Sequence, residues 1–158
     1  MSFEINIREE FVRILGKKWV KDDQVTLYTY RCDGLSLYTS PPMGVLFPET
    51  VQDLSSVIKL LHRHNISFVA RGAGTGLSGG AIPQEGSVII EMSRFKEVHE
   101  VDWVNRTITV GPGVINLHIT ENVHSHGYHY APDPSSQKAC TIGGNVAENS
   151  GGPHTLKY

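Results

Sequence analysis

The spacing of apolar residues predicts a helix at the start of the chain. Apolar side chains recur at helical intervals between residues 3 and 15, and Gly16 follows as a natural helix end. The residues of this expected apolar face are Phe3, Ile7, Phe11, Ile14 and Leu15. Residues 17 to 43 show no such period and contain the turn pairs Asp33-Gly34 and Pro41-Pro42, so we expect them to be irregular.

A strand, a helix and a second strand are predicted next. Residues 45 to 47 form a short apolar run, and Thr50 with Asp53 has the spacing of a helix-capping box ahead of a further amphipathic stretch. Residues 66 to 70 then read as a buried strand. The three elements together predict a β-α-β unit whose two strands form a parallel pair.

Five glycines occur within residues 71 to 80, and another strand is expected near residues 87 to 91. Gly74, Gly76 and Gly79 satisfy the G-x-G-x-x-G spacing, but about seven residues before the next strand leave no room for the crossover helix of a Rossmann site. No Gly-Lys-Ser/Thr follows, which excludes a Walker A loop. We therefore predict a side-chain-poor loop whose backbone N–H groups bind an anion such as a pyrophosphate.

Three further expectations concern this loop. Gly76 is expected to need a positive φ, so a β-branched replacement should abolish ligand binding. Arg71 is expected either to add positive charge at the rim or to form an ordinary surface ion pair. A purely structural turn that binds nothing is the alternative for the whole loop.

The last third of the chain begins with two predicted strands, at residues 97 to 102 and 107 to 110. A helix at about residues 114 to 126 follows, with Gly127 as its cap. Beyond it, residues 131 to 152 are rich in Gly, Ser, Asn and Pro and are expected to form a loop. Many hydrogen-bonding groups with little bulk or charge indicate a large planar cofactor, and an exposed loop is the alternative. Both glycine-rich segments are expected to face one site.

Composition excludes several classes of protein. The chain has 158 residues and a formal charge of −2, and its lack of a Lys/Arg stripe argues against nucleic acid as a partner. Two cysteines are too few for a disulfide framework, and no secretory signal or membrane-spanning run is present, so a cytoplasmic location is expected. His124, His126 and His129 have poor metal-ligand spacing, so no metal site is predicted.

Two motifs carry a resemblance to a known family. The segments VARGAGTGLSGGAIP and YAPDPSSQKACTIGGNVAENSGGPHTLKY resemble the FAD-linked oxidases of the vanillyl-alcohol oxidase and p-cresol methylhydroxylase type, especially glycolate oxidase FAD subunits and D-lactate dehydrogenases. The likeness runs from about Pro48 to Tyr158. It implies an α+β FAD-binding domain of p-cresol methylhydroxylase type, with a first subdomain at residues 1 to 95 and a truncated second subdomain at residues 96 to 158.

The resemblance also implies where FAD binds. The pyrophosphate-binding residues would be Arg71, Gly72, Ala73, Gly74, Thr75, Gly76, Leu77, Ser78, Gly79 and Gly80. The residues along the ribityl chain and flavin ring would be Pro132, Asp133, Pro134, Ser135, Ser136, Cys140, Thr141, Ile142, Gly143, Gly144, Asn145, Ala147, Asn149, Gly151 and Gly152. Thr75 stands where some relatives attach flavin through a histidine, so FAD should bind non-covalently.

The implied activity of the full-length protein is oxidation of a 2-hydroxy acid, with hydride passing to the flavin and electrons to a quinone or to partner subunits that also provide any membrane attachment. The substrate-binding and base residues of such enzymes lie in a downstream cap domain, so this chain is expected to be an N-terminal part without catalytic residues. Self-association of such a part is expected through exposed apolar strands. The alternatives are an inert truncated fragment, an FAD-binding module without catalysis, or a sugar or aryl-alcohol oxidase.

Overall fold

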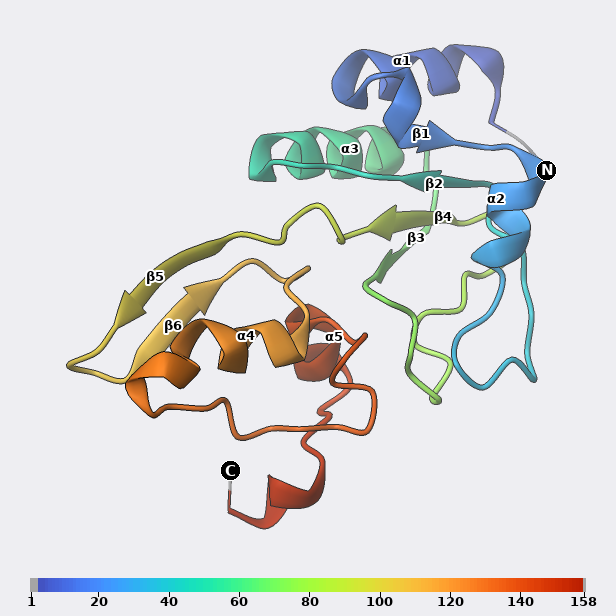
Figure 1. Cartoon of the computed structure of the whole chain (residues 1–158). Helices are drawn as coiled ribbons and strands as arrows, with labels where there is room; N and C mark the ends of the chain where they lie inside the picture. Colours follow the sequence, from blue (N-terminus) through green and yellow to red (C-terminus); the bar gives the residue numbers. More distant parts are fainter. Residues whose placement is uncertain (1–2, 158) are drawn as a thin grey trace.

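The computed structural model describes residues 3 to 157 and has the predicted α+β architecture (Figure 1). The helices are α1 (Ile5–Leu15), α2 (Gln24–Thr29), α3 (Val51–Arg63), α4 (Asn116–Val123) and α5 (Ile142–Ala147), with 3-10 turns η1 (Lys17–Trp19), η2 (His124–His126) and η3 (Pro153–Leu156). The strands are β1 (Val20–Lys21), β2 (Gly44–Leu46), β3 (Phe68–Arg71), β4 (Val88–Glu91), β5 (Val98–Asp102) and β6 (Thr107–Val110).

The four-stranded sheet has the order β1-β2-β4-β3, which corrects one prediction. Strand β2 precedes α3 and strand β3 follows it. The two strands do not pair with each other, because β4 lies between them and is parallel to both. Residues 88 to 90 of β4 are fully buried, since both edges and both faces of this strand are covered. The glycine-rich segment therefore connects β3 to the central strand of the sheet.

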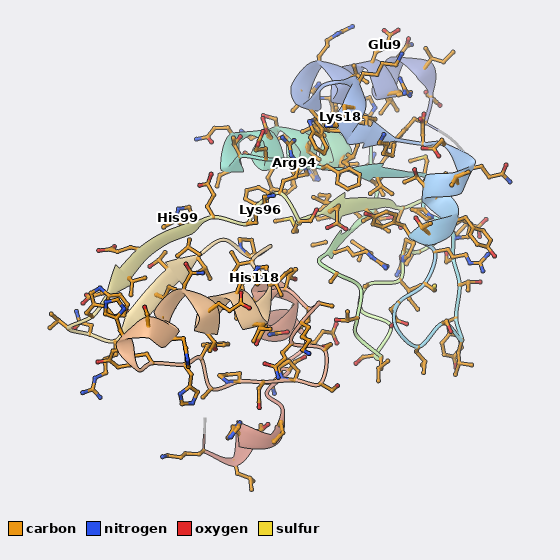
Figure 2. All side chains as sticks on the ribbon, viewed as in Figure 1. Glu9, Lys18, Arg94, Lys96, His99 and His118 are labelled. Atoms are coloured by element: carbon orange, nitrogen blue, oxygen red, sulfur yellow. The ribbon has the colours of Figure 1, made fainter. Side chains whose placement is uncertain are left out.

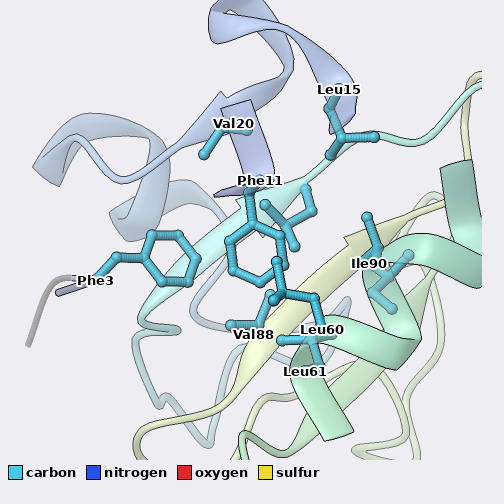
Figure 3. Packing of buried hydrophobic residues seen from close by; sticks show 10 residues of the cluster. Phe3, Phe11, Leu15, Val20, Leu60, Leu61, Val88 and Ile90 are labelled. Carbon is cyan, nitrogen blue, oxygen red and sulfur yellow. The ribbon is translucent and has the colours of Figure 1, made fainter. Parts of the chain in front are cut away.

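The main core lies between this sheet and helices α1 and α3 (Figure 3). Phe11 of α1 and Leu61 of α3 are fully buried in it, and Phe3 packs on Phe11 with a ring-centroid distance of 5.3 Å. The predicted apolar face of the first helix is confirmed, although the helix begins at Ile5 and Phe3 precedes it. The capping box of α3 is also confirmed, because Thr50 accepts from Asp53 N–H at 3.0 Å and the Asp53 carboxylate accepts from Thr50 N–H at 3.2 Å.

The prediction that residues 17 to 43 are irregular is wrong in part. Strand β1 forms there by antiparallel pairing with β2 over two residues, and α2 forms with Asp23 as its cap, whose carboxylate accepts from Thr26 N–H at 3.0 Å. Both elements are too short to show a period in the sequence. Tertiary pairing and one capping side chain decide them instead.

The hairpin β5–β6, helices α4 and α5 and the turn η2 form a second group of elements (Figure 1). Both predicted strands are confirmed, and the predicted helix at residues 114 to 126 is α4 followed by η2, with Gly127 at φ 78° as its left-handed cap. The expectation that residues 131 to 152 lack a helix is wrong, since α5 forms within them. Its cap Thr141 accepts from Gly144 N–H at 3.4 Å.

The polar side chains labelled in Figure 2 come from both groups of elements, with Glu9 in α1, His99 in β5 and His118 in α4. Lys18 and Arg94, both labelled there, lie over the Trp19 ring at 4.6 and 3.7 Å from its centroid. Arg94 also pairs with Glu49 and donates to the Phe47 carbonyl at 3.0 Å. These cations are held by local partners and do not line the cleft described below.

Candidate cofactor-binding cleft

The two glycine-rich segments lie side by side and form the walls of one cleft of about 290 Å³. One wall is the loop that follows β3, residues 71 to 80, which we call the glycine loop. The other wall is the chain around α5. The two walls are in contact at Gly72, where a Cβ would overlap the Thr141 hydroxyl. The predicted site residues that line the cleft are Arg71, Gly72, Ala73, Gly74, Thr75, Gly76, Leu77, Ser78, Gly80, Pro134, Ser135, Ser136, Cys140, Thr141, Gly144, Asn145 and Ala147.

The first wall presents unengaged backbone donors. Within the part of the chain that the structure describes, no group accepts a hydrogen bond from the N–H groups of residues 72 to 78. Positive φ values occur at Gly74 (66°) and Gly79 (83°) but not at Gly76, so the expected reason for a glycine at position 76 is wrong. Successive free N–H groups in such a turn form a concave site for an anion.

Arg71 is neither a rim cation nor a surface ion pair, which corrects both expectations for it. Its side chain is buried, and its guanidinium donates to the carbonyls of Cys32 at 2.8 Å and Ala81 at 3.1 Å. A Cβ on Gly74 would overlap that guanidinium, so the loop folds directly over it. Arg71 therefore supports the loop from the protein interior. Its positive charge lies on the buried side of the loop backbone and not at the rim of the cleft.

Buried Glu91 and half-buried Tyr30 lie near this guanidinium. Burial raises the pKa of the Glu91 carboxyl, and the opposing attraction of Arg71 is the smaller effect. Burial also raises the pKa of Tyr30 to about 12, with a further contribution from the nearby Glu91 carboxylate. The Arg71 guanidinium lies 5.2 Å from the centroid of the Tyr30 ring. The floor of the loop is thus a cluster of ionisable groups held away from solvent.

The second wall contributes Asn145, a buried side chain whose amide nitrogen has no hydrogen-bond partner among the described residues. Asn145 is 5% exposed, lines the cleft, and has an amide nitrogen that donates to no described residue. A buried amide donor without a partner costs free energy, and a ligand in the cleft that accepts from this amide would remove that cost. Cys140 is buried in the same wall as a free thiol.

Eight predicted site residues do not line the cleft: Gly79, Pro132, Asp133, Ile142, Gly143, Asn149, Gly151 and Gly152. Several of them hold the backbone in place. The Pro132 carbonyl accepts from Asn116 Nδ2 at 3.0 Å, and the Asp133 carboxylate lies 2.9 Å from His154 Nδ1. Gly152 has φ 74°, and a Cβ there would overlap the Asp133 carbonyl. Pro132, Asp133 and Gly152 therefore shape the second wall without lining the cleft.

Sequence reasoning missed four residues that line the cleft, namely Ala70, Ala81, Glu148 and Ser150. Glu148 and Ser150 lie within the second glycine-rich segment, directly beside the predicted site residues Ala147, Asn149 and Gly151. Their position in the sequence was therefore a signal that could have found them. The Glu148 carboxylate lies against Gly80 across the cleft. Asp33 and Gly34, which contact the glycine loop, were recognised only as a turn.

The structure also bears on metal and membrane sites. Among residues 3 to 157, no group of three or more His, Cys, Asp or Glu side chains lies close enough together to hold a metal ion. His126 stacks on Trp103 instead, with ring centroids 4.0 Å apart. No helix within the same range is long and apolar enough to span a bilayer.

Comparison with protein families shows the family of the chain. A family model described as "FAD binding domain" matches residues 42 to 158, which include both walls. The chain belongs to this FAD binding domain family. FAD is accordingly its cofactor, and the family relationship inferred from the two motifs is confirmed.

Curated relatives of this FAD binding domain are longer than the chain. It is 52% identical over 129 residues to the glycolate oxidase subunit GlcD of Escherichia coli (strain K12), covering 82% of this chain and 26% of that protein. It is 37% identical over 153 residues to GlcD of Bacillus subtilis (strain 168), covering 97% of this chain and 33% of that protein. The D-lactate dehydrogenase of Archaeoglobus fulgidus is 36% identical over 114 residues, 72% of this chain and 25% of the relative. The chain thus spans between a quarter and a third of these relatives.

Solved structures share the fold of the FAD binding domain. An alkyldihydroxyacetonephosphate synthase superposes with a TM-score of 0.87 at 22% identity, covering 99% of this chain and 31% of that structure. A p-cresol methylhydroxylase superposes with a TM-score of 0.75 at 20% identity, covering 89% of this chain and 28% of that structure. These similarities confirm the predicted p-cresol methylhydroxylase type of fold.

The residues of the cleft fit the chemistry of FAD. The loop offers free backbone N–H groups for an anionic pyrophosphate, and its lack of side chains lets a ligand reach the backbone. The buried Asn145 amide offers a hydrogen bond to a polar group of the same ligand. Both features point to an elongated molecule with an anionic middle and hydrogen-bonding groups beside it.

Proposed function

We propose that the cleft between the glycine loop and α5 is the FAD site, and that the sequence-predicted cofactor residues act there. The pyrophosphate binds the N–H groups of residues 72 to 78, and the Asn145 amide donates to the ribityl or flavin part. The observation that carries this proposal is the convergence of unengaged donors from two segments about 70 positions apart on a single cleft. Residues of the second wall outside the lining keep that wall in shape.

FAD binds without a covalent bond in this proposal. Thr75 lines the cleft at the position where the motif of some relatives has a histidine, and a threonine hydroxyl has no nucleophilic nitrogen with which to attach the flavin. Denaturation of the loaded protein should therefore release all flavin into the soluble fraction. Flavin that stays with the precipitated chain would contradict this part of the proposal.

The proposed activity of the whole protein is oxidation of a 2-hydroxy acid such as glycolate or D-lactate. The names of the relatives support it, since they are a glycolate oxidase subunit and a D-lactate dehydrogenase. The bound flavin supplies the acceptor for hydride from the carbinol carbon of the acid. Residues of this chain bind and orient that group, and we assign none of them a catalytic role. Substrate binding and electron transfer to a partner subunit are assigned to the remaining two thirds or more of such a protein.

The chain is proposed to consist of two subdomains, residues 1 to 95 and residues 96 to 158. The four-stranded sheet with α1 and α3 supports the first, and the hairpin β5–β6 with α4 and α5 supports the second. The cleft then lies at their junction, where dinucleotide cofactors often bind. Self-association through the exposed strands of the hairpin is a further proposal, which light scattering over a concentration series tests.

Titration of the purified chain with FAD tests the proposed function. Flavin fluorescence and calorimetry should show saturable binding at one site, and FMN, which lacks the pyrophosphate bridge, should bind more weakly. The chain alone should not turn over glycolate or D-lactate. Absence of FAD binding under conditions where the chain is folded would overturn the assignment of the cleft and would favour an inert fragment.

A further inference from the structure

Residues 32 to 34 contact the glycine loop at three points along its length. The Cys32 carbonyl accepts from Arg71 at 2.8 Å at the start of the loop. The Gly34 N–H donates to the Gly76 carbonyl at 2.9 Å in the middle of it. The Asp33 carboxylate accepts from the Gly79 N–H at 2.8 Å near its end.

Asp33 is well suited to this contact. Its side chain is buried, with 7% of its surface exposed, and its second oxygen accepts from the Leu35 N–H at 3.0 Å. Both carboxylate oxygens are therefore fixed by backbone donors, one in its own turn and one in the loop. A hydrogen bond to a charged acceptor is stronger than one between neutral groups.

Gly34 makes the close approach possible. A Cβ at this position would lie 2.8 Å from the Thr75 carbonyl oxygen, closer than side chains come to backbone oxygens. Any larger residue would push the middle of the loop away. Asp33 and Gly34 are therefore both required by the loop, for hydrogen bonding and for space respectively.

We infer that residues 32 to 34 are a clamp that positions the glycine loop for the FAD pyrophosphate, with Asp33 as its main positioning residue. The inference rests on the proposed FAD site. Neither Asp33 nor Gly79 lines the cleft, so the clamp acts from behind the loop and leaves the N–H groups of residues 72 to 78 free for the ligand. The clamp precedes residues 42 to 158, which the family model matches.

The physical reason is the conformational entropy of glycine. Glycine loses more backbone freedom on ordering than any other residue, and a loop with five glycines in ten positions would have to be ordered when the ligand binds. Contacts at the start, middle and end of the loop order it beforehand. A ligand that meets a pre-ordered loop binds more tightly, because less entropy is lost at the moment of binding.

The test compares FAD affinity and loop exchange in matched variants. Asp33→Ala removes two backbone hydrogen bonds, and Gly34→Ala displaces the loop without removing any polar group. Asp102→Ala is the control, since the Asp102 carboxylate accepts from Val104 and Asn105 N–H groups at 3.0 Å in the β5–β6 turn, away from the cleft. Calorimetry measures the Kd for FAD, and hydrogen–deuterium exchange measures protection of the peptide from residues 71 to 82 without FAD.

Asp33→Ala and Gly34→Ala should each raise the Kd for FAD at least tenfold, whereas Asp102→Ala should stay within about twofold of wild type. Asp33→Asn keeps one acceptor oxygen, so its Kd for FAD should lie between those of the wild type and Asp33→Ala. Faster exchange confined to residues 71 to 82 is expected in the two clamp variants and not in the control.

Wild-type affinity in Gly34→Ala and Asp33→Ala, or unchanged exchange of the loop, would overturn the clamp while leaving the FAD site intact. Failure of the wild type to bind FAD would instead overturn the proposed function, and the exchange comparison would still decide whether residues 32 to 34 order the loop. If Asp33→Ala does not fold, Gly34→Ala and Asp33→Asn decide the outcome.

Discussion

Replacing Asn145 by alanine should stabilise the free chain and weaken FAD binding. Asn145 is 5% exposed and its amide nitrogen has no described partner, so truncation removes an unsatisfied donor that costs about 1–3 kcal/mol. Alanine is also a better helix former than asparagine inside α5, by up to about 0.7 kcal/mol. Loss of packing by one side-chain carbon opposes these gains by about 0.8 kcal/mol. The net expectation is a stabilisation of about 1 kcal/mol or more.

The same substitution removes a hydrogen bond to the cofactor. A neutral hydrogen bond contributes about 1 kcal/mol, which corresponds to an increase of about fivefold in the Kd for FAD. At an FAD concentration 100 times the wild-type Kd, the ligand stabilises the wild type by about 2.7 kcal/mol and the variant by about 1.8 kcal/mol. The stability advantage of the variant should therefore shrink when FAD is added.

Urea unfolding followed by circular dichroism, with and without FAD, measures both effects. Asn116→Ala is a matched control, because Asn116 is equally buried but its amide already donates to the Pro132 carbonyl at 3.0 Å. The free energy of unfolding of that control should fall by about 1–3 kcal/mol, since the substitution removes a hydrogen bond made by a buried side chain. A destabilised Asn145→Ala chain, or an unchanged Kd for FAD, would refute the reasoning that a ligand completes this hydrogen bond.

Three other predictions follow from the loop, its floor and the core. Gly74→Ala should weaken FAD binding more than Gly76→Ala, because only Gly74 combines a positive φ with close contact to Arg71; calorimetry on both variants tests this, and equal affinities would contradict it. Leu61→Ala should lower the free energy of unfolding by about 2–5 kcal/mol in urea, since Leu61 is fully buried, and a loss below about 1 kcal/mol would argue against this core. The pKa of Tyr30 is raised to about 12, so its contribution to stability is complete below pH 10 and is lost as the pH rises through about 12. Tyr30→Phe should remove that alkaline loss, and the difference in urea midpoint between wild type and variant from pH 9 to 12 measures it.

Much of the fold could be predicted locally. The helix at α1 follows from its apolar spacing, α3 from its capping box, and the end of η2 from Gly127. Each of these signals involves residues within a few positions of one another, so each is visible in the sequence. The residues of the two glycine-rich segments by themselves indicated an anion such as a pyrophosphate and a large planar cofactor. The likeness of the two motifs to a known family then indicated that this cofactor is FAD.

What the sequence by itself determined is the elements with a strong local signal, such as α1 and α3, and the two glycine-rich segments assigned to the cofactor. Tertiary structure alone decided that β4 separates β2 from β3, that Arg71 is buried under the loop, and that residues 32 to 34 are hydrogen-bonded to that loop. Asp33 and Gly79 are 46 positions apart, and no periodicity connects them. Their hydrogen bond exists because the sheet brings the two turns together, and such long-range proximity depends on the packing of the whole chain.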